Sequence, residues 1–170
     1  SQTGVYDMAV YNGNLYLSTN TANASEVDRY DGGNTFTQVT LTDGKVVAGD
    51  AADVDGFNFS VYDGRLFMGA VTGSTTARVA VYSGGPVATD ASFTNLNATQ
   101  GTFVATSGYI DVTSMKVWDG ELYVAASKAG AAGVFRWTPA GVISVDTASA
   151  NWTLVNNAVG QLVSGDTAAD

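Results

Sequence analysis

The apolar positions of this chain fall into short alternating runs, and one such run recurs three times. Each copy places apolar, aromatic-rich stretches on both sides of an Asn-Gly or Asp-Gly pair, and the copies are residues 10–18, 61–69 and 117–125. Alternation at period two predicts β-strands, and an Asx-Gly pair between two strands is the strongest short-range signal for a hairpin with a type I′ turn. We therefore expect hairpin turns at Asn12-Gly13, Asp63-Gly64 and Asp119-Gly120.

Two further short strands follow each hairpin in the same register. The third strand of a unit ends in an aromatic residue, and the fourth strand carries another: Tyr30 and Phe36, Tyr82 and Phe93, Trp137 and Trp152. No stretch shows a sustained apolar period of 3.6 residues, so we expect almost no helix. Four-stranded units of about fifty residues are typical of β-propeller blades. The predicted fold class is all-β, with three four-stranded antiparallel propeller-like blades. They form one β-repeat domain, residues 1–170, with units at approximately 5–53, 54–109 and 110–170.

The repeat register also predicts the core. One blade cannot bury both of its faces, so neighbouring blades must cover them, which explains why both phases of the hairpin strands are apolar. We expect the equivalent residues Leu15, Leu66 and Leu122 to be buried, together with Val10, Val61 and Val117. Small residues end the second strand of each unit, where we expect crowding near a propeller axis. A β-sandwich would not need three in-register copies, and the coils of a β-solenoid are usually shorter.

Two resemblances to known propeller families rest on these motifs. The order of apolar strand, Asx-Gly, Leu-Tyr, small residues and Val-x-x-Tyr resembles the blades of kelch-type propellers. The segment 31–36, Asp-Gly-Gly-Asn-Thr-Phe, resembles the Asp-box turn of sialidase-type propellers, with Asp31 and Gly33 as turn residues. In that family the box is a structural turn between the third and fourth strands, which is where the segment falls here. Both resemblances imply a propeller fold, and neither identifies an activity.

Composition removes several classes of function. Sixteen acidic residues face seven basic ones, and the formal charge of −9 repels phosphate backbones and anionic lipid. We therefore expect no nucleic-acid partner, and no apolar run is long enough to predict membrane insertion. The chain has no Cys, which removes disulfides and thiolate chemistry, and no His, which removes the commonest general base and metal ligand.

One loop between predicted units concentrates carboxylates. Asp50, Asp53 and Asp55 lie in the Gly-flanked segment 49–56. Calcium takes about six to eight oxygen ligands from carboxylates and carbonyls, so these three residues are the candidate metal site and calcium the candidate cofactor. Their spacing does not match an EF-hand. The competing interpretation is a solvated acidic loop, which is the commoner outcome for such a sequence.

The number of units bears on how the chain is completed. Propellers usually close with about four to eight blades, so three units do not make a familiar ring. The segment 163–170 resembles residues 47–53, which lead directly into the next unit. We therefore expect either a segment of a longer repeat protein or a ring completed by self-association.

Two functional hypotheses from different classes remain. The first is a non-enzymatic structural or binding repeat module that is extracellular, on a cell surface or on a virion, as in an adhesin, a surface filament or a virion appendage. Low charge, the lack of Cys and His, and regular repeats favour it, and its partners would be other copies or further repeats of the same protein.

The alternative is part of a glycan-binding or glycan-processing, sialidase-like propeller, which the Asp-box-like turn suggests. Exposed aromatic residues would then stack on sugars, and glycan would be the partner. Sialidase-like catalysis would need clustered arginines, for which the candidates are Arg29, Arg65, Arg78 and Arg136.

Overall fold

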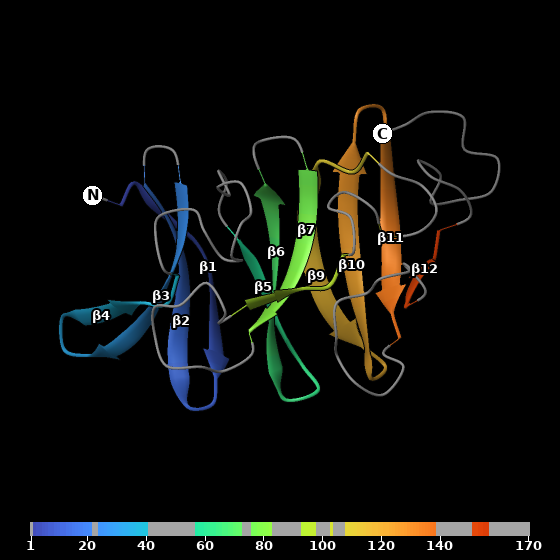
Figure 1. Cartoon of the computed structure of the whole chain (residues 1–170). Helices are drawn as coiled ribbons and strands as arrows, with labels where there is room; N and C mark the ends of the chain where they lie inside the picture. Colours follow the sequence, from blue (N-terminus) through green and yellow to red (C-terminus); the bar gives the residue numbers. More distant parts are fainter. Residues whose placement is uncertain are drawn as a thin grey trace.

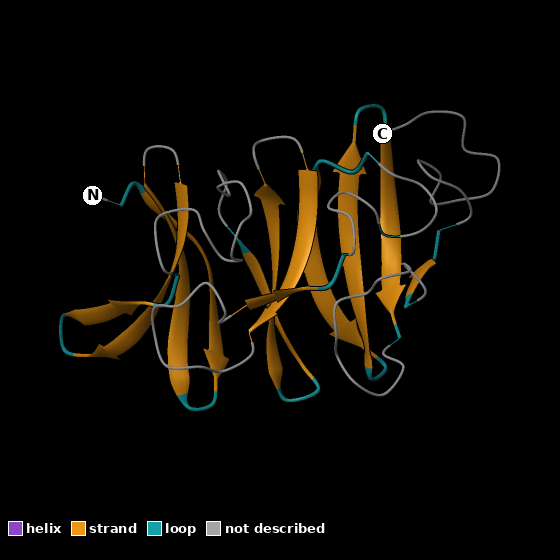
Figure 2. Cartoon of the chain, viewed as in Figure 1, coloured by secondary structure: helices purple, strands orange, loops and turns teal. Residues whose placement is uncertain are grey.

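The computed structural model describes residues 2–21, 24–40, 57–72, 76–82, 93–97, 103, 108–138 and 151–156. Every regular element in these ranges is a β-strand, as Figure 2 shows, and the strands form three four-stranded antiparallel sheets. The predicted all-β fold class of three four-stranded, propeller-like blades is therefore confirmed. The predicted unit limits at residues 53, 54 and 170 lie outside the described residues, and the division of the chain into units stays a prediction.

Each sheet is built from four strands that pair in chain order. The first sheet contains β1 (Gly4–Tyr11), β2 (Asn14–Thr21), β3 (Ala24–Gly32) and β4 (Thr35–Gln38). The middle sheet contains β5 (Asn58–Tyr62), β6 (Arg65–Thr72), β7 (Thr76–Tyr82) and β8 (Phe93–Asn95). The third sheet contains β9 (Asp111–Trp118), β10 (Glu121–Lys128), β11 (Ala131–Trp137) and β12 (Trp152–Leu154). Figure 1 shows the sheets side by side in chain order, with the middle sheet between the other two.

The three hairpins turn at the Asx-Gly pairs. Both central residues of each turn have positive φ: 48° and 75° at Asn12-Gly13, 47° and 67° at Asp63-Gly64, and 49° and 75° at Asp119-Gly120. Positive φ at both positions is what a type I′ turn requires, and Gly adopts it freely while Asn and Asp tolerate it. Because these turns match the right-handed twist of the flanking strands, each first strand pairs closely with the second.

Each sheet has two faces, which we name after equivalent residues of its second strand. The leucine face carries Leu15, Leu66 or Leu122, and the tyrosine face carries Tyr16, Phe67 or Tyr123. Directly paired residues of antiparallel strands share a face, so the pairing extends each face across the sheet. The leucine face of the middle sheet, for example, adds Met68, Phe59 and Ala80 to Leu66.

Two apolar cores hold the sheets together. In the first, the tyrosine face of the first sheet packs on the leucine face of the middle sheet. Its members include Tyr11, Tyr16 and Val27 on one side and Leu66, Met68 and Tyr82 on the other. In the second, the tyrosine face of the middle sheet packs on the leucine face of the third. Its members include Phe67, Val79 and Val81 on one side and Leu122, Val124 and Trp137 on the other. The middle sheet is thus buried on both faces.

Polar contacts fix how neighbouring sheets sit against each other. The backbone N–H groups of Phe57 and Phe59 donate to the side chains of Ser18 at 2.6 Å and Asp7 at 2.7 Å. Between the middle and third sheets, the Asn58 side-chain amide donates to the Val112 carbonyl at 2.7 Å. Because each such bond has one favoured geometry, these contacts set the offset between sheets in a way that apolar packing alone does not.

The small residues at the end of the second strands stand at the closest approach between sheets. A Cβ atom added to Gly69 would lie 2.3 Å from Cγ1 of Val112 on the third sheet. Ser18, at the equivalent position of the first sheet, is fully buried against the middle sheet. Both positions lie at close contacts between sheets, as predicted, and their place near a propeller axis stays a prediction.

The predicted burial of the leucine-face residues is partly wrong. Leu66 and Leu122 are buried, but Val61 and Val117 remain exposed. Each valine stands beside the hairpin turn on the first strand, which is an edge strand of its sheet, so a partner strand flanks it on one side only. On the first sheet, Leu15 is half-buried and Val10 exposed, because no described element of the chain covers that leucine face.

Candidate functional site

The leucine face of the first sheet is apolar and uncovered by any described element. Its clearest marker is Phe36, which is 52% exposed, whereas the equivalent Phe93 and Trp152 are each 3% exposed inside the two cores. Met8 shows the same contrast with its buried equivalents Phe59 and Met115. The part of this face around Met8 and Phe36 is therefore solvent-facing, although its equivalents are core in the other two sheets. An exposed apolar surface of this kind marks an interaction site.

The tyrosine face of the third sheet is uncovered in the same way. Trp118 is 69% exposed, whereas Tyr11, its equivalent on the first sheet, is 9% exposed. The Trp118 ring is inclined by 62° to the Tyr123 ring at a centroid distance of 5.8 Å, and we call this pair of rings the aromatic platform. The two ends of the chain of sheets thus present different faces, a leucine face at one end and a tyrosine face at the other.

Three tyrosines show what these faces do when they meet. At the interface of the first and middle sheets, Tyr82 of the leucine face lies 6.1 Å from Tyr11 and 5.8 Å from Tyr16 of the tyrosine face, between ring centroids. Burial, followed by the charge of Tyr82, raises the pKa of Tyr16 to about 12. The aromatic side chains are therefore the centre of a dry contact between sheets.

Three polar side chains are linked by hydrogen bonds at the edge of the third sheet's tyrosine face. Arg136 pairs with Glu121 at 3.3 Å, and the Tyr123 hydroxyl donates to the same carboxylate at 3.1 Å. Burial, followed by the Glu121 hydrogen bond and charge, raises the pKa of Tyr123. This group holds Tyr123 in place and keeps a cation and an anion beside the exposed Trp118 ring.

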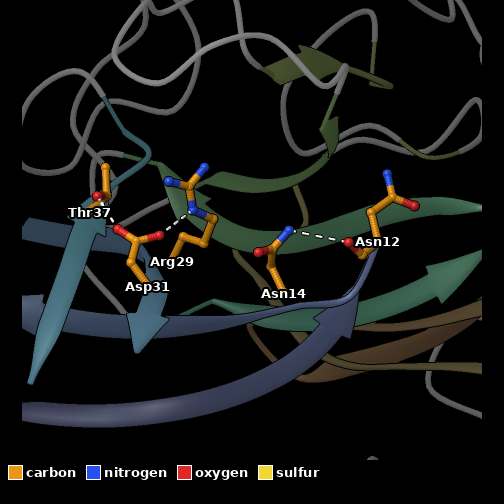
Figure 3. Close-up of polar contacts among 5 residues, drawn as sticks. All are labelled: Asn12, Asn14, Arg29, Asp31 and Thr37. Carbon is orange, nitrogen blue, oxygen red and sulfur yellow. Dashed lines mark hydrogen bonds and ion pairs between the residues drawn. The ribbon is translucent and has the colours of Figure 1, made fainter. Parts of the chain in front are cut away.

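The Asp-box-like turn lies on the first sheet, where Figure 3 shows Asp31 between two donors. The Arg29 guanidinium donates to Asp31 at 2.7 Å, and the Thr37 hydroxyl donates to its other carboxylate oxygen. These two hydrogen bonds, that from Arg29 first, lower the pKa of Asp31. Gly33, at φ 60°, accepts a hydrogen bond from the Tyr30 hydroxyl at 3.1 Å. The Thr37–Asp31 bond joins β4 to β3, and the other two contacts lie within β3 and its turn.

Figure 3 also shows a hydrogen bond at the hairpin residue Asn12. Its carbonyl accepts a hydrogen bond from the Asn14 side chain at 3.2 Å, across the first hairpin turn. The turn residues are thus engaged within their own turns.

Two carboxylates that the sequence reasoning missed share the leucine face of the first sheet. Glu26 and Asp28 are both buried, and the Gln2 amide donates to them at 3.2 and 2.9 Å, while the Thr19 hydroxyl donates to Asp28 at 2.7 Å. Two acids spaced by two residues in a predicted strand must share a face, so the alternation itself was the available signal. The Gln2 and Thr19 side chains are thus among the hydrogen-bond donors that hold these two carboxylates in place.

The candidate calcium ligands Asp50, Asp53 and Asp55 lie outside the described residues, so the metal prediction stays open. Within the described ranges there is no group of three or more His, Cys, Asp or Glu side chains that would hold a metal ion. The same ranges contain no long apolar helix of the kind that spans a bilayer.

The four candidate arginines are distributed over all three sheets. Arg29 lies in β3, Arg65 in β6, Arg78 in β7 and Arg136 in β11. Arg29 and Arg136, which occupy the same repeat position, each pair with an acid of their own sheet. This placement follows the repeat and does not gather the arginines of the first and third sheets at one point.

Comparisons with known proteins add little beyond the geometry. No protein-family model matches the sequence, and no curated protein matches it. Among solved structures, the chain is similar to the high-resolution structure of an α-L-arabinofuranosidase from Clostridium thermocellum, with 15% sequence identity and a TM-score of 0.49. The match covers 87% of this chain and 49% of the other, so this chain spans about half the length of that protein.

Proposed function

We propose that this chain is a non-enzymatic structural and binding repeat module of an extracellular or surface-exposed protein, of the adhesin, filament or virion-appendage type. Its function is to associate through the faces of its sheets. Other copies or further repeats of the same protein are its partners.

One observation carries this proposal. The same two faces that form both internal cores recur at the two ends of the row of sheets, where Phe36 and Trp118 are exposed. Soluble monomers rarely leave large apolar patches in water, because burying them is favourable at roughly 25 cal/mol per Å². The end faces are therefore suited to association.

The mass in solution tests this function. Light scattering during gel filtration, over a range of protein concentrations, should give a particle heavier than the 17.5 kDa of one chain. A particle of 17.5 kDa at every concentration up to the millimolar range would contradict the proposal. Protease treatment of intact source cells or virions tests the location, since a surface protein is cleaved without lysis and an internal one is protected.

Glycan binding is a second candidate, and the exposed Trp118–Tyr123 platform favours it. Aromatic rings stack on the apolar faces of sugars, and the adjoining Arg136–Glu121 pair supplies hydrogen-bonding groups at its edge. The Asp-box-like turn around Asp31 agrees with a relation to sialidase-type propellers.

A glycan array, followed by sialidase and glycosidase assays, separates the two candidates. Under the glycan hypothesis, Trp118→Ala should abolish retention of the bound sugar, whereas Phe36→Ala on the opposite end should leave it unchanged. Hydrolysis of a glycan by the purified protein would overturn the non-enzymatic assignment. An array without any signal would leave the structural module as the better account.

Calcium is the one cofactor that we propose to test, on the basis of the Asp50, Asp53 and Asp55 segment. If the folded state alone binds calcium, stability rises by about 2.7 kcal/mol at a hundredfold excess over the dissociation constant. The melting temperature should then rise with millimolar calcium and fall back with chelator, and the double change Asp53→Asn and Asp55→Asn should remove this shift. A melting temperature indifferent to calcium would identify a solvated acidic loop.

A further inference from the structure

We propose that two copies of this chain associate head to tail, with the tyrosine face of the third sheet of one copy packed on the leucine face of the first sheet of the other. This inference rests on the proposed module function and names the partner, the two surfaces and their polarity. The partner is a second copy of the same chain.

The internal interfaces establish the polarity. At both of them a tyrosine face meets a leucine face: Tyr16 with Leu66 and Tyr82 in one core, and Phe67 with Leu122 and Trp137 in the other. In the described residues, no leucine face meets a leucine face and no tyrosine face meets a tyrosine face. The repeat therefore uses one kind of contact, and the two uncovered faces are its two unmatched halves.

Repeat equivalence then names the contacts of the new interface. Tyr82 of the leucine face sits between Tyr11 and Tyr16 of the tyrosine face. Tyr30 occupies the position of Tyr82 on the first sheet, and Trp118 and Tyr123 occupy those of Tyr11 and Tyr16 on the third. We expect Tyr30 of one copy to enter the platform formed by Trp118 and Tyr123 of the other. Phe36 and Met8 would be buried beside it, like their equivalents in the two cores.

The head-to-tail polarity is tested with two variants, each of which blocks one of the two faces. Met8→Asp places a charge on the leucine face, and Trp118→Asp places one on the tyrosine face, both at exposed positions where folding should tolerate them. Phe36→Asp and Lys116→Asp serve as second variants for the same faces if the first pair folds poorly. Masses are measured at 0.15 M salt, where a Debye length of about 8 Å screens the charge of −9 on each chain.

Head-to-tail association predicts complementation. Each variant alone loses one half of the contact and should weaken self-association by at least about thirtyfold. An equimolar mixture should recover a one-to-one dimer, because the intact tyrosine face of Met8→Asp meets the intact leucine face of Trp118→Asp.

Other outcomes distinguish a failure of the head-to-tail polarity from a failure of the module function. If Trp118→Asp still dimerises, Met8→Asp does not and the mixture gains nothing, then two leucine faces pair symmetrically; the module function stands and the head-to-tail polarity is overturned. The reverse pattern, with Met8→Asp still dimeric, overturns it likewise through the tyrosine faces. A wild-type chain that stays monomeric at all concentrations overturns the module function itself.

Discussion

The first and middle sheets carry nearly the same pattern of apolar side chains, yet they differ in what surrounds those side chains. Leu66 and Phe93 of the middle sheet are buried, while the equivalent Leu15 is half-buried and Phe36 is exposed. The middle sheet has a neighbour on each face, and the first has a described neighbour only on its tyrosine face. An apolar position in a repeat protein therefore becomes core only when the adjacent repeat is present, as nearest-neighbour stability in repeat proteins implies.

The third sheet completes this comparison from the opposite end. Its leucine face is buried against the middle sheet, and its tyrosine face carries the exposed Trp118. One position of that exposed face differs from the covered faces, because Lys116 stands where the first sheet has Ala9 and the middle sheet has Ser60. Arg136 has an arginine, Arg29, as its equivalent on the covered face of the first sheet, so it does not distinguish the two.

The largest expected effect concerns the leucines. Leu66→Ala should lower the free energy of unfolding by about 2–5 kcal/mol, since it opens a cavity in a fully packed core. Leu15→Ala, its matched control on the first sheet, should cost less than half as much, because water already reaches that side chain. Urea unfolding of dilute protein measures both, and equal costs would contradict the difference between the sheets.

The next effect concerns the buried Tyr16 and the free energy of unfolding at alkaline pH. Burial raises the pKa of Tyr16 to about 12, above its ordinary value near 10, so the folded state holds the proton more tightly than the unfolded chain. Its contribution to stability is therefore complete below pH 10 and is lost as the pH rises from 10 through 12. Tyr16→Phe should reduce that alkaline loss of stability in a pH series of urea titrations. An unchanged pH profile would show that Tyr16 ionises freely in the folded state.

The close approach of the middle and third sheets predicts a smaller cost. Gly69→Ala places a methyl group 2.3 Å from Val112 and should destabilise by about 1–3 kcal/mol, since the sheets must separate. The double variant with Val112→Ala should recover part of that loss, which a double-mutant cycle of thermal melts measures. Ala125→Ser, at the equivalent position on the uncovered face, is the control and should be nearly neutral. Destabilisation without any recovery by Val112→Ala would mean that the clash is not the cause.

The smallest effect concerns the hairpin glycines, where the cost of a substitution should be the same in all three sheets. Gly64→Val should cost about 1–2 kcal/mol, because a β-branched residue resists the positive φ of 67° found there. Gly13→Val and Gly120→Val should cost the same within error, since the strain is local to each turn. Unequal costs, measured by thermal unfolding, would show that packing between sheets reaches the hairpin turns.

By itself the sequence determined the local structure of this protein. The Asx-Gly pairs and the alternating strands specify hairpins through backbone sterics and side-chain direction, which act within a few residues. The same reasoning yields three antiparallel four-stranded sheets and the division of each sheet into two apolar faces. Those faces are the candidate site, so its residues were visible in the repeat pattern from the start.

Only the tertiary structure decided which of these faces are core and which are surface. Val10, Val61 and Val117 are exposed because each lies beside the hairpin turn on an edge strand, whereas Phe59 and Met115, farther from the turn on the strands of Val61 and Val117, are buried. Alternation along one strand does not encode this difference. The close contact of Gly69 with Val112 and the shared hydrogen bonds of Glu26 and Asp28 also depend on segments far apart in the chain. Burial is a property of neighbours in space, and a pattern read along one strand contains no information about which neighbour is present.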